Sequence, residues 1–426
     1  MTNHYSEIPE GSLYNQGDRI GLLKKVLSEL GNQDRQFKII HVCGTNGKGS
    51  TATMIAKILA ELGDKVGLFM SPVVGPRNSD ICINFESISN REVRNIEHRV
   101  NNLPALKSGD KRLSPFEMRV IVAILYFASG GVDFAVLECG LGGELDATNA
   151  VFTTMYSIFT PISLDHLGIL GDTLAEIATA KAKIIRPSNT TIVAPSEPGV
   201  VQSIIRKEAL DKGSTLIMAD SIAVTKNGNK VSATFGDTNY EFKFGLSGNY
   251  QQTNLRTVLA WFMNFIDRHS ISQGPQTLLS KALGDLMIPG RFEEINNTPK
   301  IIVDGAHNPD GISSFKETVS NEFITHELII VVGFLKDKNY VKSMAELATL
   351  NNPRFVITQP INDNRALAVG TLAETATNLG MKIAGKESNP RHAIDKAISL
   401  AEANTTIFCV GSFYLINPIR DYILNK

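Results

Sequence analysis

Short apolar runs alternate with helical patterns along almost the whole chain, and this alternation limits the folds that are open to it. Lys38–Cys43 and Val132–Leu137 have the composition of buried strands, whereas Thr51–Leu62 and Glu117–Ala128 have the spacing of apolar residues that is typical of helices. Strands that alternate with helices are typical of a mostly parallel sheet with helices on its faces. The sequence therefore predicts an α/β fold.

The chain is long enough for two domains, since its 426 residues exceed what one hydrophobic core usually organises. The alternation restarts after Met287 and predicts a second, smaller α/β domain. We expect the boundary within Ile288–Lys300, with residues 1–290 in the first domain and residues 291–426 in the second. The strands expected in the second domain are Lys300–Asp304, Glu327–Val332, Arg354–Thr358 and Thr405–Gly411.

Residues 215–246 have a different pattern. Leu216–Met218, Lys230–Phe235 and Glu241–Leu246 are short runs separated by Asn-Gly and Gly-Asp turns. Such turns between short strands are typical of hairpins. We therefore expect this segment to form a hairpin-rich edge of the first domain.

The bulk composition argues against several classes of partner. A net charge of −1 and a sequence pI of about 6.7 give no electrostatic support for nucleic-acid binding. The longest apolar run, Val120–Ala128, is too short for a bilayer span, and Met1–Gly11 lacks the apolar core of a signal peptide. The four cysteines have no CxxC spacing. We expect a cytoplasmic monomer that binds neither nucleic acid nor membrane.

The segment KIIHVCGTNGKGS, from Lys38 to Ser50, places a glycine-rich turn and a lysine between a strand and a helix. Glycines let backbone N–H groups face an anion, the helix N-terminus adds partial positive charge, and Lys48 can meet the terminal phosphates of a nucleotide. The hydroxyl group of Ser50 or Thr51 can hold Mg²⁺. A glycine-rich turn with an incidental lysine is the alternative, but the order of the parts favours binding of ATP or GTP. The expected contacts are Asn46, Gly47, Lys48, Gly49, Ser50 and Thr51.

Other polar side chains follow strands of the first domain. Glu138 ends an apolar run where a parallel sheet presents ligand-binding groups, although it could also be only the first polar residue beyond a strand. His166 follows a predicted strand and could hold a metal or serve as a structural donor. The spacing of Lys181 to Ile177 and Ile184 turns it inward, where a buried amine needs a partner or a chemical change. A salt-bridged lysine is the alternative.

Taken together, these motifs resemble one family. The loop HVCGTNGKGS, Glu138 followed by GLGG, Asp165-His166 followed by LGILGDT, and Lys181 within AKA are similar in order and spacing to the folylpolyglutamate synthase and dihydrofolate synthase branch of the Mur ligases. The resemblance implies a central P-loop domain of the Mur ligase type with a mostly parallel sheet. It also implies a smaller, Rossmann-like C-terminal α/β domain.

The resemblance implies metal ligands and catalytic residues as well. In the family, the lysine that matches Lys181 is carbamylated by CO₂, which turns a cation into an anionic oxygen ligand suited to a hard divalent ion. The resemblance implies two Mg²⁺ sites and ATP as the co-substrate, and it is compatible with a monovalent cation as a further cofactor. The implied metal ligands are Ser50, Ser71, Glu138, His166 and carbamylated Lys181, and the implied catalytic residues are Lys48, Glu138, His166, Lys181 and His307.

Further family segments bear on the nucleotide. In IPGRFEE, Arg291 is expected to clamp phosphate oxygens through its fork of donors. In VDGAHNPDG, the family places Asp304 on the nucleotide and His307 near the γ-phosphate. Asn254, in a segment similar to the family's GxHQxxN, would reach the adenine. Taken singly, Arg291 could also form an interdomain salt bridge, Asp304 could be a turn aspartate, and His307 could cap a helix.

The resemblance also indicates a folate site, with departures. Val73 stands where the family has the histidine of Ser-Pro-His, Glu144 where it has the arginine of GLGGR, and Tyr250 where it has the histidine of GxHQ. All three lie in or near substrate-handling parts, so they put the choice of carboxylate substrate in doubt. The implied folate contacts are Ser114, Pro115, Phe116, Glu117, Glu144, Leu145 and Asp146.

The activity that the resemblance implies is ATP-dependent addition of L-glutamate to a folate. The substrate carboxylate attacks the γ-phosphate to give an acyl phosphate, and the amine then displaces phosphate to give an amide. A dihydrofolate synthase that joins dihydropteroate and glutamate, alone or with the first activity, is one alternative, and a Mur-like ligase for a non-folate carboxylate is another. A nucleotide-binding regulator without turnover belongs to a different class, and the set of Lys48, Glu138, His166 and Lys181 speaks against it.

Overall fold

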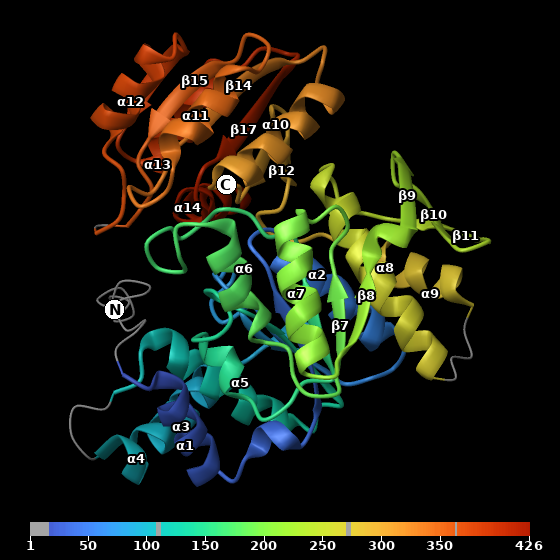
Figure 1. The fold of residues 1–426 in the computed structure, drawn as a ribbon. Coiled ribbons are helices and arrows are strands. Elements are labelled where there is room, and N and C mark those ends of the chain that lie inside the picture. The colour runs from blue at the N-terminus through green and yellow to red at the C-terminus, as the bar shows by residue number, and fades with distance from the viewer. Residues whose placement is uncertain (1–16, 108–111, 270–273, 363) are drawn as a thin grey trace. The chain divides into compact units, whose positions relative to one another are not determined.

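The alternating strands and helices form two units in the computed structural model, which describes residues 17–107, 112–269, 274–362 and 364–426 (Figure 1). The first unit contains Met1–Gly245 and Gln252–Leu286, and the second contains Leu246–Gln251 and Met287–Lys426. The short segment Leu246–Gln251 is therefore grouped with the second unit, although the sequence pattern places it within the first domain.

One large sheet organises the first unit. Neighbouring strands are parallel from β2 to β8, whereas β3 and β4 add an antiparallel edge. The central strand β1 lies between β5 and β6 and is buried on both faces, as the sequence predicts. In sheet order the strands are β4 (Glu86–Ser87), β3 (Ile81–Ile83), β2 (Val66–Phe69), β5 (Phe134–Glu138), β1 (Lys38–Cys43), β6 (Tyr156–Phe159), β7 (Thr190–Val193) and β8 (Thr215–Met218).

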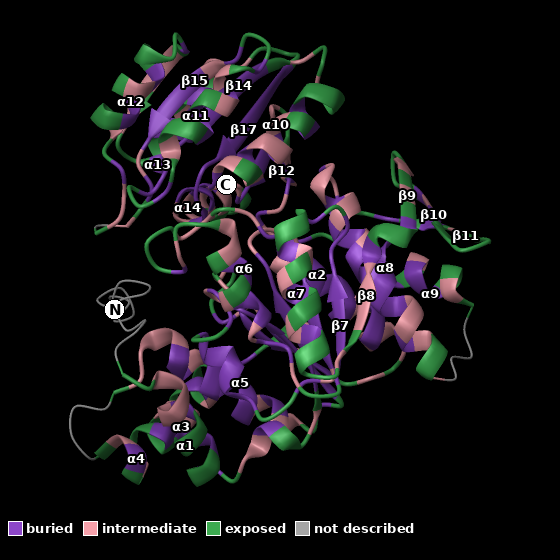
Figure 2. Cartoon of the chain, viewed as in Figure 1, coloured by how far each residue is buried: buried purple, intermediate pink, exposed green. Residues whose placement is uncertain are grey.

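Helix α5 illustrates how the sequence sets the elements of this unit. Ser114 caps its start through a reciprocal pair of hydrogen bonds with Glu117, Pro115 occupies its first turn, and Gly131 ends it in the left-handed conformation. Its apolar run is buried along most of its length (Figure 2). The helices of the unit are α1 (Arg19–Glu29), α2 (Lys48–Glu61), α3 (Asn90–Asn101), α4 (Pro104–Lys107), α5 (Pro115–Gly130), α6 (Leu174–Ala182), α7 (Gly199–Asp211), α8 (Tyr250–Arg268, whose first two residues are grouped with the second unit) and α9 (Pro275–Leu283).

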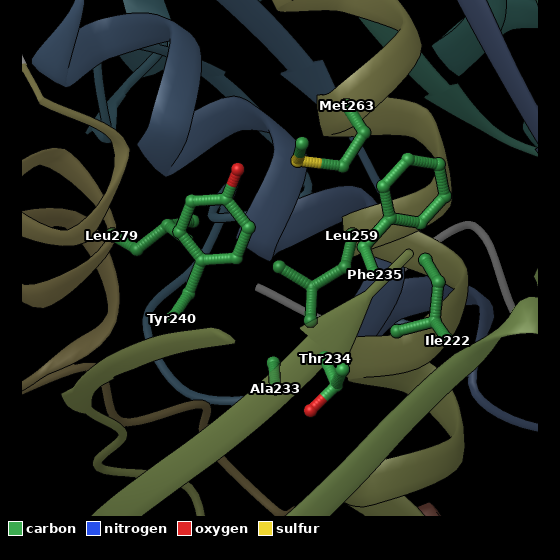
Figure 3. Close-up of a pocket in the computed structure, with 8 residues that line it drawn as sticks. All are labelled: Ile222, Ala233, Thr234, Phe235, Tyr240, Leu259, Met263 and Leu279. Carbon is green, nitrogen blue, oxygen red and sulfur yellow. The ribbon is translucent and has the colours of Figure 1, made fainter. Parts of the chain in front are cut away.

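The hairpin segment of the first unit is only partly as expected. The strands β9 (Ile222–Asn227), β10 (Lys230–Phe235) and β11 (Thr238–Lys243) form a small antiparallel sheet. Leu216–Met218 lies in a strand as expected, but the hairpin expected there is wrong, because β8 pairs in parallel with β7 and extends the large sheet. An apolar hollow without charged side chains lies between the small sheet and helices α8 and α9 (Figure 3), and it is lined by Ile222, Ala233, Thr234, Phe235, Tyr240, Leu259, Met263 and Leu279.

The second unit has its own parallel sheet and its own core. All neighbouring strands are parallel except β12, which pairs antiparallel with β13. In sheet order they are β12 (Glu293–Asn297), β13 (Lys300–Asp304), β17 (Thr405–Val410), β14 (Glu327–Val332), β15 (Arg354–Thr358) and β16 (Lys382–Glu387). The helices are α10 (Pro309–Glu322), α11 (Tyr340–Ala348), α12 (Val369–Asn378), α13 (Pro390–Ser399) and α14 (Phe413–Leu424).

The architecture agrees with the fold class predicted from the sequence: two α/β units, each with a mostly parallel sheet. Among the described residues, no helix is both long enough and apolar enough to cross a membrane.

Candidate active site

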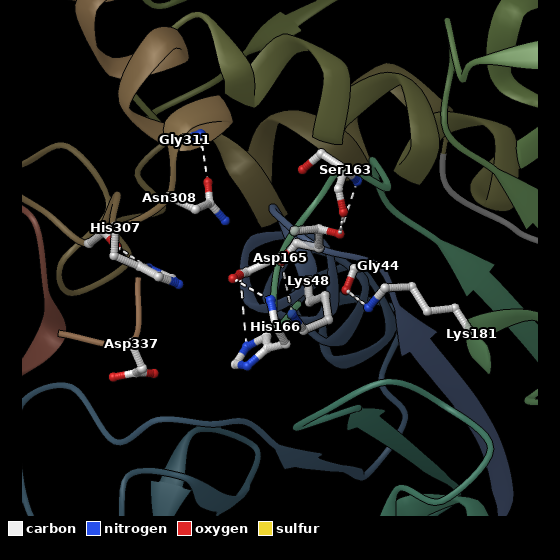
Figure 4. A network of polar contacts seen from close by, with 12 residues as sticks. Gly44, Lys48, Ser163, Asp165, His166, Lys181, His307, Asn308, Gly311 and Asp337 are labelled. Atoms are coloured by element: carbon white, nitrogen blue, oxygen red, sulfur yellow. Dashed lines mark hydrogen bonds and ion pairs between the residues drawn. The ribbon is translucent and has the colours of Figure 1, made fainter. Parts of the chain in front are cut away.

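The glycine-rich loop connects β1 to α2 at the carboxyl edge of the large sheet. Strand β1 ends at Cys43 and α2 begins at Lys48, so the intervening backbone turns within four residues. The Nζ atom of Lys48 donates a hydrogen bond to the Thr45 carbonyl oxygen at 3.0 Å, which folds the amine back over the loop (Figure 4). The loop therefore presents a helix N-terminus and an ammonium group at one place, as an anion site requires.

Gly47 is required by both its conformation and its neighbour. Its φ of +84° lies in the left-handed region, and a Cβ atom added there would lie 2.1 Å from Oδ1 of Asn254 on α8. Asn254 is buried against the loop. The structure thus brings together two of the residues that the sequence predicts to bind the nucleotide.

We expect Gly47→Ala to weaken nucleotide binding at least tenfold, because the methyl group must displace Asn254 and because alanine disfavours this φ by about 1 kcal/mol. Nucleotide affinity measured by calorimetry tests this. Gly63→Ala is the matched control, since Gly63 has a φ of +95° with open space around it. If both variants lose affinity equally, the contact with Asn254 is not the cause.

Glu138 lies at the end of β5, next to the loop strand. In the sheet register it pairs with Val42 of β1, and its Oε2 atom accepts a hydrogen bond from the Ser71 backbone N–H at 3.1 Å. The Glu138 side chain is buried. A buried carboxylate at the carboxyl end of a parallel strand is typical of a ligand-binding group.

Lys181 faces inward from α6, as its spacing to Ile177 and Ile184 predicts. It is only 4% exposed, and its Nζ atom donates a hydrogen bond to the Gly44 carbonyl oxygen at 2.8 Å (Figure 4). Burial lowers the pKa of the Lys181 amine, and the nearby charge of Lys48 lowers it further. No salt bridge of Lys181 is present among the described residues, so the alternative of a salt-bridged lysine is wrong there.

The loop that follows β5 packs directly on α6. A Cβ atom on Gly143 would lie 2.8 Å from the carbonyl oxygens of Ala180 and Lys181, and the Glu144 N–H donates to the Ala180 carbonyl at 2.8 Å. This close approach explains the glycine at position 143. It also ties the segment after Glu138 to the helix that carries Lys181.

The donor set suits a hard divalent cation. Ser50 and Thr51 are fully buried in the first turn of α2, and Thr51 Oγ1 has no hydrogen-bond partner among the described residues. A buried hydroxyl group without a partner costs about 1–3 kcal/mol, so a bound ligand there would be stabilising. Within the described ranges, no group of three or more His, Cys, Asp or Glu side chains is arranged to hold a metal ion. The oxygen ligands expected here are instead hydroxyl and carboxylate groups of mixed residue types.

His166 lies in a strained loop before α6. Its φ of +52° is unusual for a residue other than glycine, and its backbone N–H donates to Oδ1 of Asp165 at 2.8 Å. The ring Nε2 atom lies 3.8 Å from Oδ2 of Asp165 (Figure 4). The neighbouring Thr173 and Glu176 form the capping box that their spacing predicts, and it starts α6.

In the second unit, Asp304 ends β13 and is buried. Its Oδ2 atom accepts hydrogen bonds from the Tyr250 hydroxyl at 2.7 Å and from the Phe292 N–H at 2.8 Å, and Oδ1 accepts one from the Ala306 N–H at 2.8 Å. The Arg291 guanidinium carbon lies 4.6 Å from the centroid of the Phe413 ring. The residues that the sequence predicts in this unit are thus held near one strand end.

His307 follows in the same segment. Its Nδ1 atom lies 2.8 Å from the Gly305 carbonyl oxygen, and its ring packs near Phe413. The start of α10 is capped by Asn308, whose Oδ1 atom accepts a hydrogen bond from the Gly311 N–H at 2.8 Å (Figure 4). The helix cap is therefore Asn308, so the alternative role of His307 as a helix cap is wrong.

Several residues predicted to contact a folate have structural partners. Glu117 caps α5 and forms an ion pair with Arg19, whose Nε atom donates to Oε1 at 2.9 Å. Asp146 accepts a hydrogen bond from the Leu141 N–H at 2.7 Å and is buried in its loop. Phe116 packs against the Phe69 ring, with 5.9 Å between centroids. Ser114 caps α5 with Pro115 after it, and Glu144 and Leu145 are exposed.

His41 lies in the middle of β1 and is not among the site residues predicted from the sequence. Its Nε2 atom lies 2.7 Å from Oγ1 of Thr148 and 3.0 Å from Sγ of Cys139. Burial, with a smaller contribution from Arg186, lowers the pKa of His41 to about 3, so the ring is neutral at physiological pH. A histidine inside an otherwise apolar strand was the one available signal for this buried network.

Comparison with known proteins agrees with this geometry. The Mur ligase middle-domain family matches residues 42–262, and the Mur ligase glutamate ligase domain family matches residues 290–413. The chain is 30% identical over 423 residues to the dihydrofolate synthase/folylpolyglutamate synthase of Bacillus subtilis, covering 94% of each chain.

Solved structures give the same result. The folylpolyglutamate synthase of Mycobacterium tuberculosis complexed with ADP superimposes with a TM-score of 0.86 at 26% identity, covering 95% of this chain and 94% of that one. The bifunctional folylpolyglutamate synthase/dihydrofolate synthase of Yersinia pestis, complexed with AMPPNP and a Mn ion, gives a TM-score of 0.82 at 25% identity, covering 95% and 93%.

The two α/β units and the phosphate loop that leads into α2 are those of a Mur ligase. The similarity to the Bacillus subtilis protein extends over nearly the full length of both chains. The chain belongs to the dihydrofolate synthase/folylpolyglutamate synthase family.

Proposed function

We propose that the chain is an ATP-dependent, ADP-forming ligase that adds L-glutamate to a folate through an acyl phosphate. The observation that carries this proposal is the meeting of the phosphate loop with the buried Lys181 amine at the carboxyl edge of one parallel sheet. The relatives support it, because the Bacillus subtilis protein is named dihydrofolate synthase/folylpolyglutamate synthase. The related structures from Mycobacterium tuberculosis and Yersinia pestis contain ADP and AMPPNP with a Mn ion, respectively.

The first chemical step is attack of the substrate carboxylate on the γ-phosphate, which releases ADP. Lys48 would stabilise the charge on the transferred phosphoryl group, since its ammonium group is held over the loop before the substrate arrives. The amine of glutamate then attacks the acyl carbon, the C–N bond forms, and inorganic phosphate leaves. We assign Arg291 and Asp304 to the nucleotide and His307 to the γ-phosphate.

A divalent metal fits the donors at the loop. We propose Ser50, Ser71, Glu138, His166 and carbamylated Lys181 as ligands of two Mg²⁺ ions, and we propose a monovalent cation as a further cofactor. The bound ions would offset phosphate charge. The lowered pKa of Lys181 supports the carbamate, because the neutral amine is the form that reacts with CO₂.

The remaining assignments concern the acid substrate. We propose that Phe116, Glu144, Leu145 and Asp146 line the folate side, with Ser114, Pro115 and Glu117 at the start of α5. A dihydrofolate synthase activity on dihydropteroate, alone or in the same enzyme, is the second candidate, since the Bacillus subtilis relative carries both names. We further propose that the enzyme acts as a cytoplasmic monomer on small molecules only.

An assay of the purified enzyme tests the function. ADP release with ATP alone is expected to be slow, and it is expected to rise when tetrahydrofolate or dihydropteroate is added with glutamate. Mass spectrometry of the product then distinguishes one added glutamate on dihydropteroate from a lengthened folate tail. ADP release that does not depend on either pterin substrate, with no amide product, would contradict the proposal.

A further inference from the structure

The Tyr250 hydroxyl is the side-chain donor to a buried carboxylate in the second unit. Asp304 has two backbone donors from its own neighbourhood, the N–H groups of Phe292 and Ala306. The hydroxyl of Tyr250, which is distant in sequence, donates to Oδ2 at 2.7 Å. A hydrogen bond to a buried carboxylate is stronger than one between neutral groups and fixes the carboxylate's orientation.

The charge state of the pair favours this donor role. Burial raises the pKa of Tyr250 well above its usual value, and the adjacent Asp304 raises it further, so the phenol remains protonated at physiological pH. Burial also raises the pKa of Asp304, and the hydrogen bond from Tyr250 opposes that effect ahead of those from Ala306 and Phe292. Tyr250 thus helps to keep Asp304 ionised.

The orientation of Asp304 in turn fixes the backbone beside Arg291. Phe292 has a φ of +48°, a conformation that is unfavourable for an aromatic residue, and its N–H is held by Oδ2 of Asp304. Arg291 is the preceding residue. Rotation of the Asp304 carboxylate would break its hydrogen bond to the Phe292 N–H. The peptide between Arg291 and Phe292 could then relax, and the direction of the Arg291 side chain would change.

The segment that carries Tyr250 is itself anchored within the second unit. The backbone N–H of Asn249 donates to Oγ1 of Thr318 on α10 at 2.9 Å. The segment Leu246–Gln251 accordingly belongs to the second unit. The phenol therefore approaches Asp304 from a fixed backbone, which makes it suitable for positioning.

We propose that Tyr250 is a positioning residue for nucleotide binding, which holds Asp304 in place and, through Phe292, orients Arg291. The inference rests on the proposed function, because it takes Arg291 and Asp304 to bind ATP. It adds a role for a residue at which the chain departs from the family motif.

Tyr250→Phe tests the inference, since it removes only the hydroxyl group. We expect the KM for ATP to rise about tenfold, the effect of one hydrogen bond to a charged group. The kcat and the KM values for the pterin substrate and glutamate are expected to stay within about twofold of the parent. Tyr156→Phe is the matched control, because the buried Tyr156 hydroxyl donates to Oδ1 of Asn264 at 3.0 Å in the first unit.

A double-mutant cycle with Asp304→Asn completes the test. If Tyr250 acts through Asp304, Tyr250→Phe in the Asp304→Asn background changes the KM for ATP by less than about twofold. An unchanged KM for ATP in an active Tyr250→Phe enzyme would overturn the inference. So would an equal rise in all three KM values with a loss of Tm like that of Tyr156→Phe. A parent enzyme without glutamate ligation would instead overturn the proposed function.

Discussion

Lys48→Ala is expected to lower the rate of ATP-dependent ligation on the order of 10³-fold while the protein stays folded. Lys48 is the first residue of α2, and its amine is held over the loop by a hydrogen bond to the Thr45 carbonyl at 3.0 Å. Alanine keeps the helix but removes the cation that would offset charge on the transferred phosphoryl group. The measurement is ADP release at saturating ATP, pterin substrate and glutamate.

Lys57→Ala is the control for this variant. Lys57 lies on the same helix, and its amine is 3.8 Å from the Phe85 ring centroid, a cation–π contact between two half-buried side chains. The same substitution there removes a lysine without touching the loop, and activity is expected to persist. If Lys48→Ala releases ADP near the parental rate, the role of Lys48 in phosphoryl transfer is wrong.

Buried parallel strands were the most predictable elements. The bounds expected for Lys38–Cys43, Lys300–Asp304, Glu327–Val332 and Arg354–Thr358 are those of β1, β13, β14 and β15. Each is buried on both faces, so its interior is apolar, apart from His41 in β1, and a polar residue stands at one or both ends. Composition alone then marks both the strand and its limits.

Elements at sheet edges were not predictable in the same way. Strand β16, with the sequence KIAGKE, was missed because it lies at the edge of its sheet and buries little of its surface. Strand β8 was placed in a hairpin, since its partner β7 lies beyond a whole helix in the sequence. The start of α2 was expected at Thr51, but it lies at Lys48, because Gly47 ends the loop in the left-handed conformation.

In the site, the sequence predicts the inward orientation of Lys181 but not the partners of the site residues. Helical spacing predicts that Lys181 faces inward, and its burial confirms this. Its acceptor, the Gly44 carbonyl, is a backbone atom and leaves no trace in side-chain patterns. The pairing of Glu117 with Arg19 was equally hidden, because it joins helices that only the tertiary structure brings together.

Lys181→Met is expected to lower ligase activity by about 10²-fold or more while the protein stays folded. Methionine is similar in length and suits a buried site, but it cannot react with CO₂. Under the proposed function, the variant therefore lacks the anionic oxygen ligand that the carbamate supplies. The measurement is the rate in CO₂-depleted buffer and again after bicarbonate is added. Bicarbonate is expected to raise the activity of the parent and to leave that of the variant unchanged.

Two further variants separate the carbamate from simple packing. Lys183→Met carries the same substitution two residues further on, at the C-cap of α6, where the amine forms an ion pair with Glu208 at 2.7 Å and the side chain is 37% exposed. It is expected to keep both activity and the bicarbonate response, since an exposed ion pair contributes only about 0–1 kcal/mol. Lys181→Ala leaves a cavity, and added acetate is expected to restore part of its activity by supplying a carboxylate. If the parent shows no carbamate signal in ¹³C NMR with labelled bicarbonate, and Lys181→Met turns over normally, the buried amine has a structural role alone.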